Sequence, residues 1–133
     1  MSPELHSLAL VTVFTALMWV PYILDEIKVR GLIDAVGYPP DPKPLDPWAR
    51  RLKAAHYNAI ENLVVFAALV LTAHAANISG PAIAGAACVY LWARVVHAAA
   101  YTFAIPWVRT LAFATGVGSQ LCIAWHILAG CSR

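Results

Sequence analysis

Long stretches without a charged residue dominate this sequence: residues 5–24, 62–93 and 110–132 contain no Asp, Glu, Lys or Arg. Twenty residues in an α-helix extend about 30 Å, which is the thickness of the hydrocarbon core of a bilayer. Charged residues make up only 12% of the chain, whereas soluble domains carry about 25%. The sequence therefore predicts an all-α integral membrane protein. A formal net charge of +2 gives no reason to expect nucleic acid as a partner.

Prolines and short polar segments divide the chain into helices. Five prolines between residues 36 and 47 exclude a helix there and predict an extended loop. Asp46 followed by Pro47 is typical of a helix start, with the Asp46 side chain as the cap. Pro21 lies within the first apolar stretch and predicts a kink. We expect one transmembrane domain over residues 1–133. Its four helices are expected at about residues 4–30, 47–77, 81–105 and 106–130.

The basic residues predict the orientation of these helices in the membrane. Six of the nine lie in or beside the loop that joins the first and second helices, whereas the turn between the second and third has none. Loops rich in Lys and Arg stay in the cytoplasm. We therefore expect a cytoplasmic long loop and both termini outside. The six residues are Lys28, Arg30, Lys43, Arg50, Arg51 and Lys53.

This topology brings polar residues of three helices to the same depth, near the cytoplasmic ends. Spacings of three, four and seven residues keep each set on one face of its helix. Glu61 and Arg94 are each costly to leave unpaired inside a membrane, so we expect an ion pair between them. The residues are Arg51, Asn58 and Glu61 on the second helix, Tyr90, Arg94, His97 and Tyr101 on the third, and Arg109 and Thr110 on the fourth.

Three interpretations of this polar set are open. In the first, the ion pair only fixes the second helix to the third. In the second, a surplus of cationic and phenolic groups surrounds an anionic ligand, such as a small peptide with two carboxylates and an amine. In the third, Glu61 exchanges protons for cations, as in a small proton-coupled multidrug transporter. The surplus groups are Arg51, Arg94, Arg109 and Tyr101.

The cysteines suggest no metal site, and the remaining histidines of the apolar stretches leave one alternative open. Cys88, Cys122 and Cys131 match no metal-binding or redox spacing, and we interpret them as small core residues without a disulfide framework. His74 and His126 fall at similar depth, so haem bound by both rings is an alternative. Hydrogen bonds to a neighbouring helix are the ordinary role of histidine at such positions.

Three segments together resemble the MAPEG superfamily of membrane-associated proteins in eicosanoid and glutathione metabolism. They are KAAHYNAIENLVVF at residues 53–66, ARVVHAAAY at residues 93–101 and PWVRT at residues 106–110. The resemblance implies a four-helix membrane bundle that assembles as a homotrimer, here as a bacterial-type member in the bacterial inner membrane. It also implies glutathione as co-substrate, held between subunits near the cytoplasmic face, and a lipophilic substrate that arrives from the lipid bilayer.

The same resemblance implies roles for individual residues. Arg109 is similar in position to the arginine that stabilises the glutathione thiolate, and Tyr101 is placed to donate a hydrogen bond to the sulfur. These two are the catalytic candidates. Arg51 supplies positive charge on the same face. The positions that match the glutathione-binding motif or line the same cleft are Asn58, Glu61, Arg94, His97 and Tyr101.

The chain departs from the family pattern at four positions. Ala54 and Tyr57 stand where glutathione-binding members have arginines, Arg50 replaces an acidic residue, and Phe113 replaces a tyrosine of some members. The changes at Ala54 and Tyr57 remove charge that would bind carboxylates. The expected function is a glutathione-dependent transferase or peroxidase for small lipophilic electrophiles or lipid peroxides. The alternative is a non-catalytic membrane protein of the same fold that has lost glutathione binding.

Overall fold

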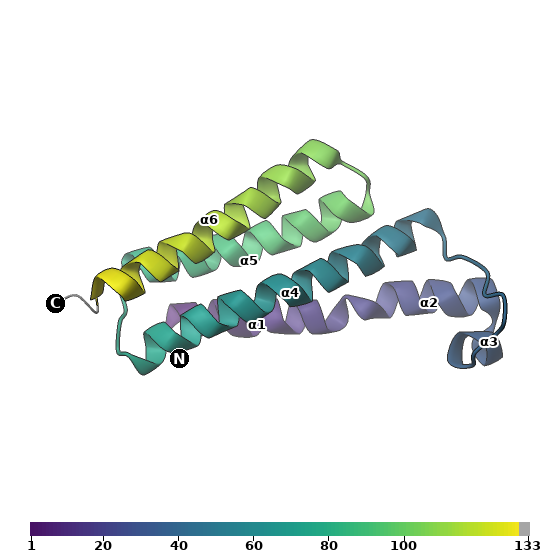
Figure 1. Cartoon of the computed structure of the whole chain (residues 1–133), viewed down its shortest axis with the longest axis horizontal. Coiled ribbons are helices and arrows are strands. Elements are labelled where there is room, and N and C mark those ends of the chain that lie inside the picture. The colour runs from purple at the N-terminus through teal and green to yellow at the C-terminus, as the bar shows by residue number, and fades with distance from the viewer. Residues whose placement is uncertain (131–133) are drawn as a thin grey trace.

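The computed structural model describes residues 1–130, and within that range every regular element is a helix. Four segments are long and apolar enough to cross a membrane, and the first of them consists of α1 and α2 end to end. Figure 1 shows the segments running along the long axis of the molecule. The helices are α1 (Pro3–Leu17), α2 (Trp19–Arg30), α3 (Leu32–Val36), α4 (Pro47–Ala75), α5 (Pro81–Thr102) and α6 (Pro106–Gly130).

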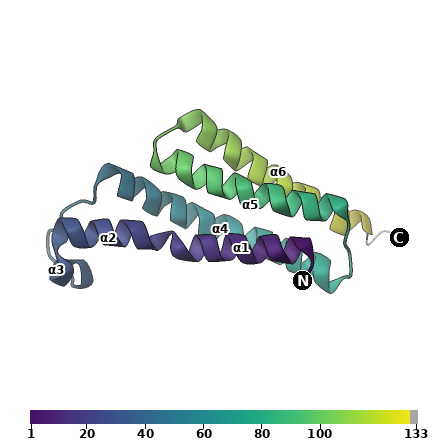
Figure 2. The same ribbon diagram turned by 180° about the vertical axis from the view of Figure 1, so that it is seen from behind.

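The two ends of this bundle differ. The N-terminus of the chain and the end of α6 lie at one end, as Figures 1 and 2 show from opposite sides. The other end, here called the loop end, holds the end of α2, the short helix α3, the loop to α4 and the turn between α5 and α6. The loop end therefore gathers the first turns of α4, the last turns of α5 and the first turns of α6.

The first membrane segment is divided at Met18, one turn before the proline at which the sequence predicts a kink. Helix α1 ends at Leu17, and α2 begins at Trp19 after a break at Met18. Pro21 has no backbone N–H, so the carbonyl of Leu17 lacks the donor that an uninterrupted helix would supply. The amide of Met18 instead bonds the carbonyl of Thr15, at 3.2 Å. The disruption that Pro21 causes therefore lies one turn before the proline, at Met18.

Two helices end earlier than the sequence pattern predicts. Helix α4 ends at Ala75 rather than near residue 77, and α5 ends at Thr102 rather than near residue 105. Each is followed by a residue with left-handed backbone, Asn77 with φ 56° and Ala104 with φ 59°. Ile105 precedes a proline, which disfavours helical backbone and forces α5 to stop. A hydrogen bond from the Ile105 amide to the carbonyl of Ala100, at 2.8 Å, closes the end.

The core is made of two kinds of contact. At mid-depth, Phe66 of α4 stacks on Tyr90 of α5 with ring centroids 3.8 Å apart, among buried aliphatic residues. Towards the loop end, buried alanines such as Ala59 and Ala98 separate the helices instead. Small side chains let helix backbones approach closely, so short polar side chains can reach a neighbouring helix. The outward faces of the long helices remain apolar, as expected of an integral membrane protein.

A cluster of charges fixes the loop to the start of α4. Asp25, whose side chain is buried, accepts hydrogen bonds from the Asp46 amide at 2.9 Å and from Lys28 Nζ at 3.2 Å. Lys28 also donates to the Asp46 carboxylate, at 2.6 Å. Asp46 does hold the N-cap position of α4, but its side chain makes no capping hydrogen bond. The predicted capping hydrogen bond is therefore wrong, because the Asp46 carboxylate accepts from Lys28 instead.

We predict that Ala104→Gly stabilises the protein by about 1 kcal/mol. A left-handed backbone strains any residue with a β-carbon, and glycine removes that strain. Ala104 is exposed, so the lost methyl group buries nothing. The free energy of unfolding in mixed detergent micelles is the measurement. Asn77→Gly is the control and should change it little, because asparagine tolerates this conformation. A destabilised Ala104→Gly would contradict the prediction.

We also predict that acid weakens the contact between the loop and α4. The hydrogen bond from Lys28 lowers the pKa of the Asp46 carboxyl from its ordinary value. A carboxyl whose pKa is lower in the folded state stabilises that state above its ordinary pKa of about 4, and loses this effect as pH falls through the lowered value.

The measurement is the thermal unfolding midpoint as a function of pH. The wild type should exceed Asp46→Asn near pH 6, and the gap should shrink as the pH falls below about 4. Asp34→Asn, which changes an exposed carboxylate of α3, should follow the wild type throughout. A constant gap between the wild type and Asp46→Asn would show that the carboxylate charge has no part in the contact.

Candidate functional site

A buried arginine lies at the centre of the polar residues near the loop end. The Arg94 side chain on α5 is buried, with only 2% of the residue exposed. Its Nη2 donates to the Oδ1 of Asn58 on α4, at 2.7 Å. The Asn58 carbonyl accepts from Asn62 Nδ2 at 2.9 Å, and the Asn62 carbonyl accepts from Gln120 Nε2 on α6 at 3.0 Å. This chain of hydrogen bonds joins α4, α5 and α6.

Three buried polar atoms beside this chain have no hydrogen-bond partner within residues 1–130. They are the Tyr90 hydroxyl, Arg94 Nε and His97 Nδ1, all on one face of α5. Buried polar groups are nearly always paired with protein or with ordered water. Gly116 of α6 lies opposite, and a β-carbon there would be 3.7 Å from Arg94 Cδ. The face is thus closely covered by α6 and still has free donors.

A second polar group lies one turn further towards the α5–α6 turn. The Arg109 guanidinium stands over the Tyr101 ring, 5.0 Å from its centroid. The His97 ring is 5.7 Å from the same ring, edge to face. Arg51 reaches across from α4 and donates from Nε to the Thr102 carbonyl, at 2.8 Å. Arg51, Tyr101 and Arg109 line a cavity of about 180 Å³. The buried and the outer polar residues are therefore continuous through His97 and Tyr101.

The expected ion pair between Glu61 and Arg94 is absent from the part of the chain that the structure describes, and this prediction is wrong. The ion pairs found there join Lys28 and Arg30 to acids of the loop end, and Glu61 is exposed. A step of three residues turns a helix by about 300° rather than 360°. Asn58 therefore faces α5, whereas Glu61 is rotated away from it.

The remaining predicted residues come together except Thr110, which is exposed and bonds the Pro106 carbonyl, and the result is a site with excess positive charge. Arg51, Arg94 and Arg109 have no acidic partner among residues 1–130. Such a site attracts an anion, since guanidinium groups bind carboxylates through paired N–H donors. Sequence reasoning missed two members of the hydrogen-bonded chain, Asn62 and Gln120. Gln120 is the only glutamine in the sequence, and a polar side chain within a membrane helix is a signal of an interhelical hydrogen bond.

The cysteines and histidines outside this site differ in part from expectation. Cys88 is exposed rather than a core residue, Cys122 is half-buried, both are free, and Cys131 lies outside the described residues. His126 Nδ1 lies 2.8 Å from the Cys122 carbonyl, within its own helix, and His74 is exposed. No cluster of three metal-ligating side chains occurs within residues 1–130.

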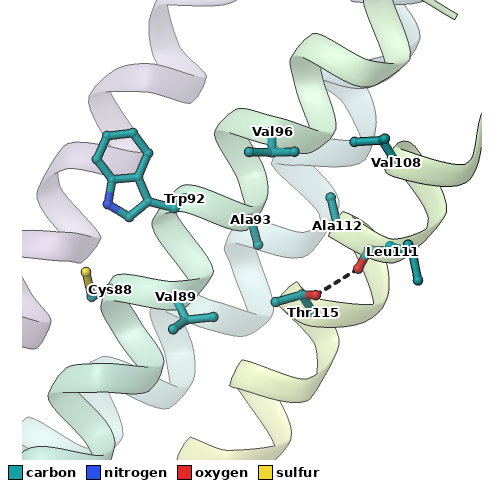
Figure 3. Close-up of a pocket in the computed structure, with 9 residues that line it drawn as sticks. All are labelled: Cys88, Val89, Trp92, Ala93, Val96, Val108, Leu111, Ala112 and Thr115. Carbon is teal, nitrogen blue, oxygen red and sulfur yellow. Dashed lines mark hydrogen bonds between the residues drawn. The ribbon is translucent and has the colours of Figure 1, made fainter. Parts of the chain in front are cut away.

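Cys88 lines an apolar groove of about 440 Å³ between α5 and α6, which Figure 3 shows together with Trp92, Val96 and Thr115. The Thr115 hydroxyl in it is already bonded to the Leu111 carbonyl, at 2.8 Å. None of the predicted site residues lines this groove. It is therefore separate from the polar site.

Comparison with known families gives one match. The model of the MAPEG family matches residues 6–129, which is nearly the whole chain. The chain belongs to the MAPEG family. No curated protein and no solved structure matches it. The MAPEG match includes all four membrane segments and both polar groups of the site, so the site belongs to the family fold and to no added segment.

We predict that Asn58→Ala destabilises this MAPEG protein by about 1.5–3 kcal/mol. Arg94 then keeps its charge in an apolar setting without its hydrogen bond, and bonds to charged groups contribute about that much. Asn58→Asp should be tolerated, because a carboxylate accepts the same bond. The measurement is again the free energy of unfolding in micelles.

The double variant Asn58→Ala with Arg94→Met tests the cause. Removing the guanidinium should recover most of the loss, because replacing both members of a buried polar pair by apolar groups is often nearly neutral. Strictly additive effects of the two changes would mean that the hydrogen bond makes no contribution of its own.

Proposed function

We propose that the protein is a glutathione-dependent membrane transferase or peroxidase that acts on small lipophilic electrophiles or lipid peroxides. The observation that carries the proposal is the cavity where Arg51, Tyr101 and Arg109 meet, beside the His97 ring that contacts Tyr101. Membership of the MAPEG family, many of whose members depend on glutathione, supports it. No other part of the described chain gathers as many cations without acidic partners.

The donors and acceptors of the site fit glutathione. Its two carboxylates require cationic donors, and Arg51 supplies such donors inside the cavity. Its ammonium group requires an acid, and Glu61 is exposed one turn from Asn58. The unpartnered Nδ1 of His97 adds a further polar contact. Because positions 54 and 57 carry no arginine, the binding of glutathione depends on these groups alone.

The size of the cavity argues that one subunit does not complete the site. It encloses about 180 Å³, whereas pockets for small molecules usually have about 300–1,000 Å³. A second subunit that covers the exposed sides of Glu61 and Arg109 would enlarge and close it. We therefore include a homotrimer with glutathione between subunits in the proposal, with the loop end at the cytoplasmic face of a bacterial inner membrane.

Two residues have the chemical roles in this proposal. Bound glutathione would supply a thiolate, which is the nucleophilic form of a thiol. The Arg109 guanidinium favours that form by charge, and it is always protonated in proteins. Tyr101 has its ring under the same guanidinium, so its hydroxyl is held where it donates a hydrogen bond to the sulfur or to the leaving group. Lipophilic substrates reach the site sideways from the bilayer.

One observation also favours a non-catalytic role. Asn58 and Arg94 bind each other within one chain, so both motif residues have a structural purpose without any ligand. A family member that has lost glutathione binding would keep this bond. The two functions differ in whether the donors of Arg51 and Arg109 bind glutathione.

We predict that Arg109→Gln lowers the fraction of thiolate in bound glutathione at least about tenfold, because one adjacent cation lowers the pKa of an acid by 1–3 units. The ultraviolet absorbance of the thiolate, titrated with glutathione in purified full-length protein, is the measurement. Arg50→Gln, which removes an exposed arginine outside the cavity, is the matched control and should resemble the wild type.

Binding heat measured in the same titration separates the two functions. Wild-type protein with neither thiolate absorbance nor heat would support the non-catalytic role and end the enzymatic proposal. Binding with equal absorbance in the wild type and Arg109→Gln would keep glutathione as a ligand and remove Arg109 from its assigned role.

A further inference from the structure

A second apolar groove lies at the loop end, where the first membrane segment is broken. It has a volume of about 480 Å³ and lies between the α1–α2 break, the first turns of α4 and the last turns of α5. The break at Met18 interrupts the surface of the segment at this place. Among the residues that line the groove are Leu17, Pro21, Trp48, Leu52, Ala99 and Phe103.

The lining of this groove suits a hydrocarbon chain. The Thr102 hydroxyl is the one side-chain hydroxyl in it, and it is already bonded to the Ala98 carbonyl at 2.8 Å. Trp48, near the start of α4, lines the same groove, and indole rings favour the boundary between lipid and water. A polar ligand would have few hydrogen-bond partners in this groove, whereas an acyl chain requires no hydrogen bonds. The groove belongs to membrane segments, so bilayer lipid has access to it.

A cation stands beside the groove. Arg51 donates from Nε to the carbonyl of Thr102, a residue of the groove wall. The other N–H groups of Arg51 make no hydrogen bond within residues 1–130. Arg50, the preceding residue, is exposed, and the loop end holds five further basic residues, of which Lys28 and Arg30 are paired with acids. Basic residues beside membrane helices attract anionic lipid headgroups, and a guanidinium binds phosphate through paired donors.

We propose that this groove binds one acyl chain of an anionic phospholipid of the bilayer, with the phosphate of its headgroup on Arg51. The apolar lining selects a hydrocarbon chain, and the adjacent guanidinium selects a negative headgroup. Neither this groove nor the groove between α5 and α6 (Figure 3) has a basic residue in its lining, but within residues 1–130 only this one has a wall residue bonded by an arginine side chain. The apolar wall of the lipid site is separate from the proposed enzymatic site, since Trp48, Leu52 and Ala99 do not line the cavity at Arg109. Arg51 lines that cavity, so a lipid phosphate and a glutathione carboxylate would compete for its guanidinium.

The test is native mass spectrometry of the full-length protein taken from vesicles with equal parts of phosphatidylglycerol and phosphatidylcholine. The wild type should retain phosphatidylglycerol about fivefold more often than phosphatidylcholine, which is the preference that one cation near an anionic headgroup supports. Ala99→Phe, which fills the groove from an exposed position, should abolish retention of both lipids. Ala114→Phe is the matched control, because Ala114 is exposed on α6 outside the groove, and it should retain lipid as the wild type does.

A second pair of variants tests the headgroup. Arg51→Gln should reduce the preference for phosphatidylglycerol to about one, and Arg50→Gln should leave it near the wild-type value. Circular dichroism of each variant verifies that it is folded. Equal retention by Ala99→Phe and Ala114→Phe would overturn the proposal. So would an Ala99→Phe variant that keeps its lipid but no longer associates with other copies of the chain, because the groove would then be a subunit contact.

Discussion

The hydrogen bond between Arg94 and Asn58 is the interaction on which the polar interior depends. A guanidinium 2% exposed among apolar helices keeps its charge at a high cost in desolvation, unless partners replace the lost water. Here the neutral side-chain amide of Asn58 supplies one partner. Because the amide is neutral, the positive charge of Arg94 remains uncompensated, whereas a carboxylate partner would neutralise it. The same bond that holds α4 to α5 therefore leaves the site able to attract an anion.

Alanine and glycine make this arrangement possible. Ala59 and Ala98 separate α4 from α5 near the loop end, and Gly116 lets the backbone of α6 pass close to Arg94 and Tyr90. With larger residues at these positions, short side chains such as that of Asn58 would not reach the next helix. Prolines then set where each helix starts or stops, and so they place Arg109 beside Tyr101 just after the α5–α6 turn.

The loop end combines two chemical environments on opposite sides of α5. The polar cavity lies on the side of Tyr101 and Arg109, whereas the apolar groove lies on the side of Ala99 and Phe103. Arg51 of α4 stands between them, bound to the end of α5. A membrane protein that joins a water-soluble thiol to a lipophilic molecule requires access from both the aqueous phase and the lipid. The loop end places a polar cavity and an apolar groove within a few turns of helix.

Much of this protein followed from its sequence, because long charge-free stretches admit only helices in a membrane and proline marks their starts. The depth shared by Asn58, Arg94, His97, Tyr101 and Arg109 also followed, since helix rise and topology determine it. The partner of Arg94 did not follow. Sequence spacing places Asn58 and Glu61 on a similar face, but only the rotation of α4 against α5 decides which one α5 meets. The two grooves likewise depend on how whole helices pack, which no local pattern encodes.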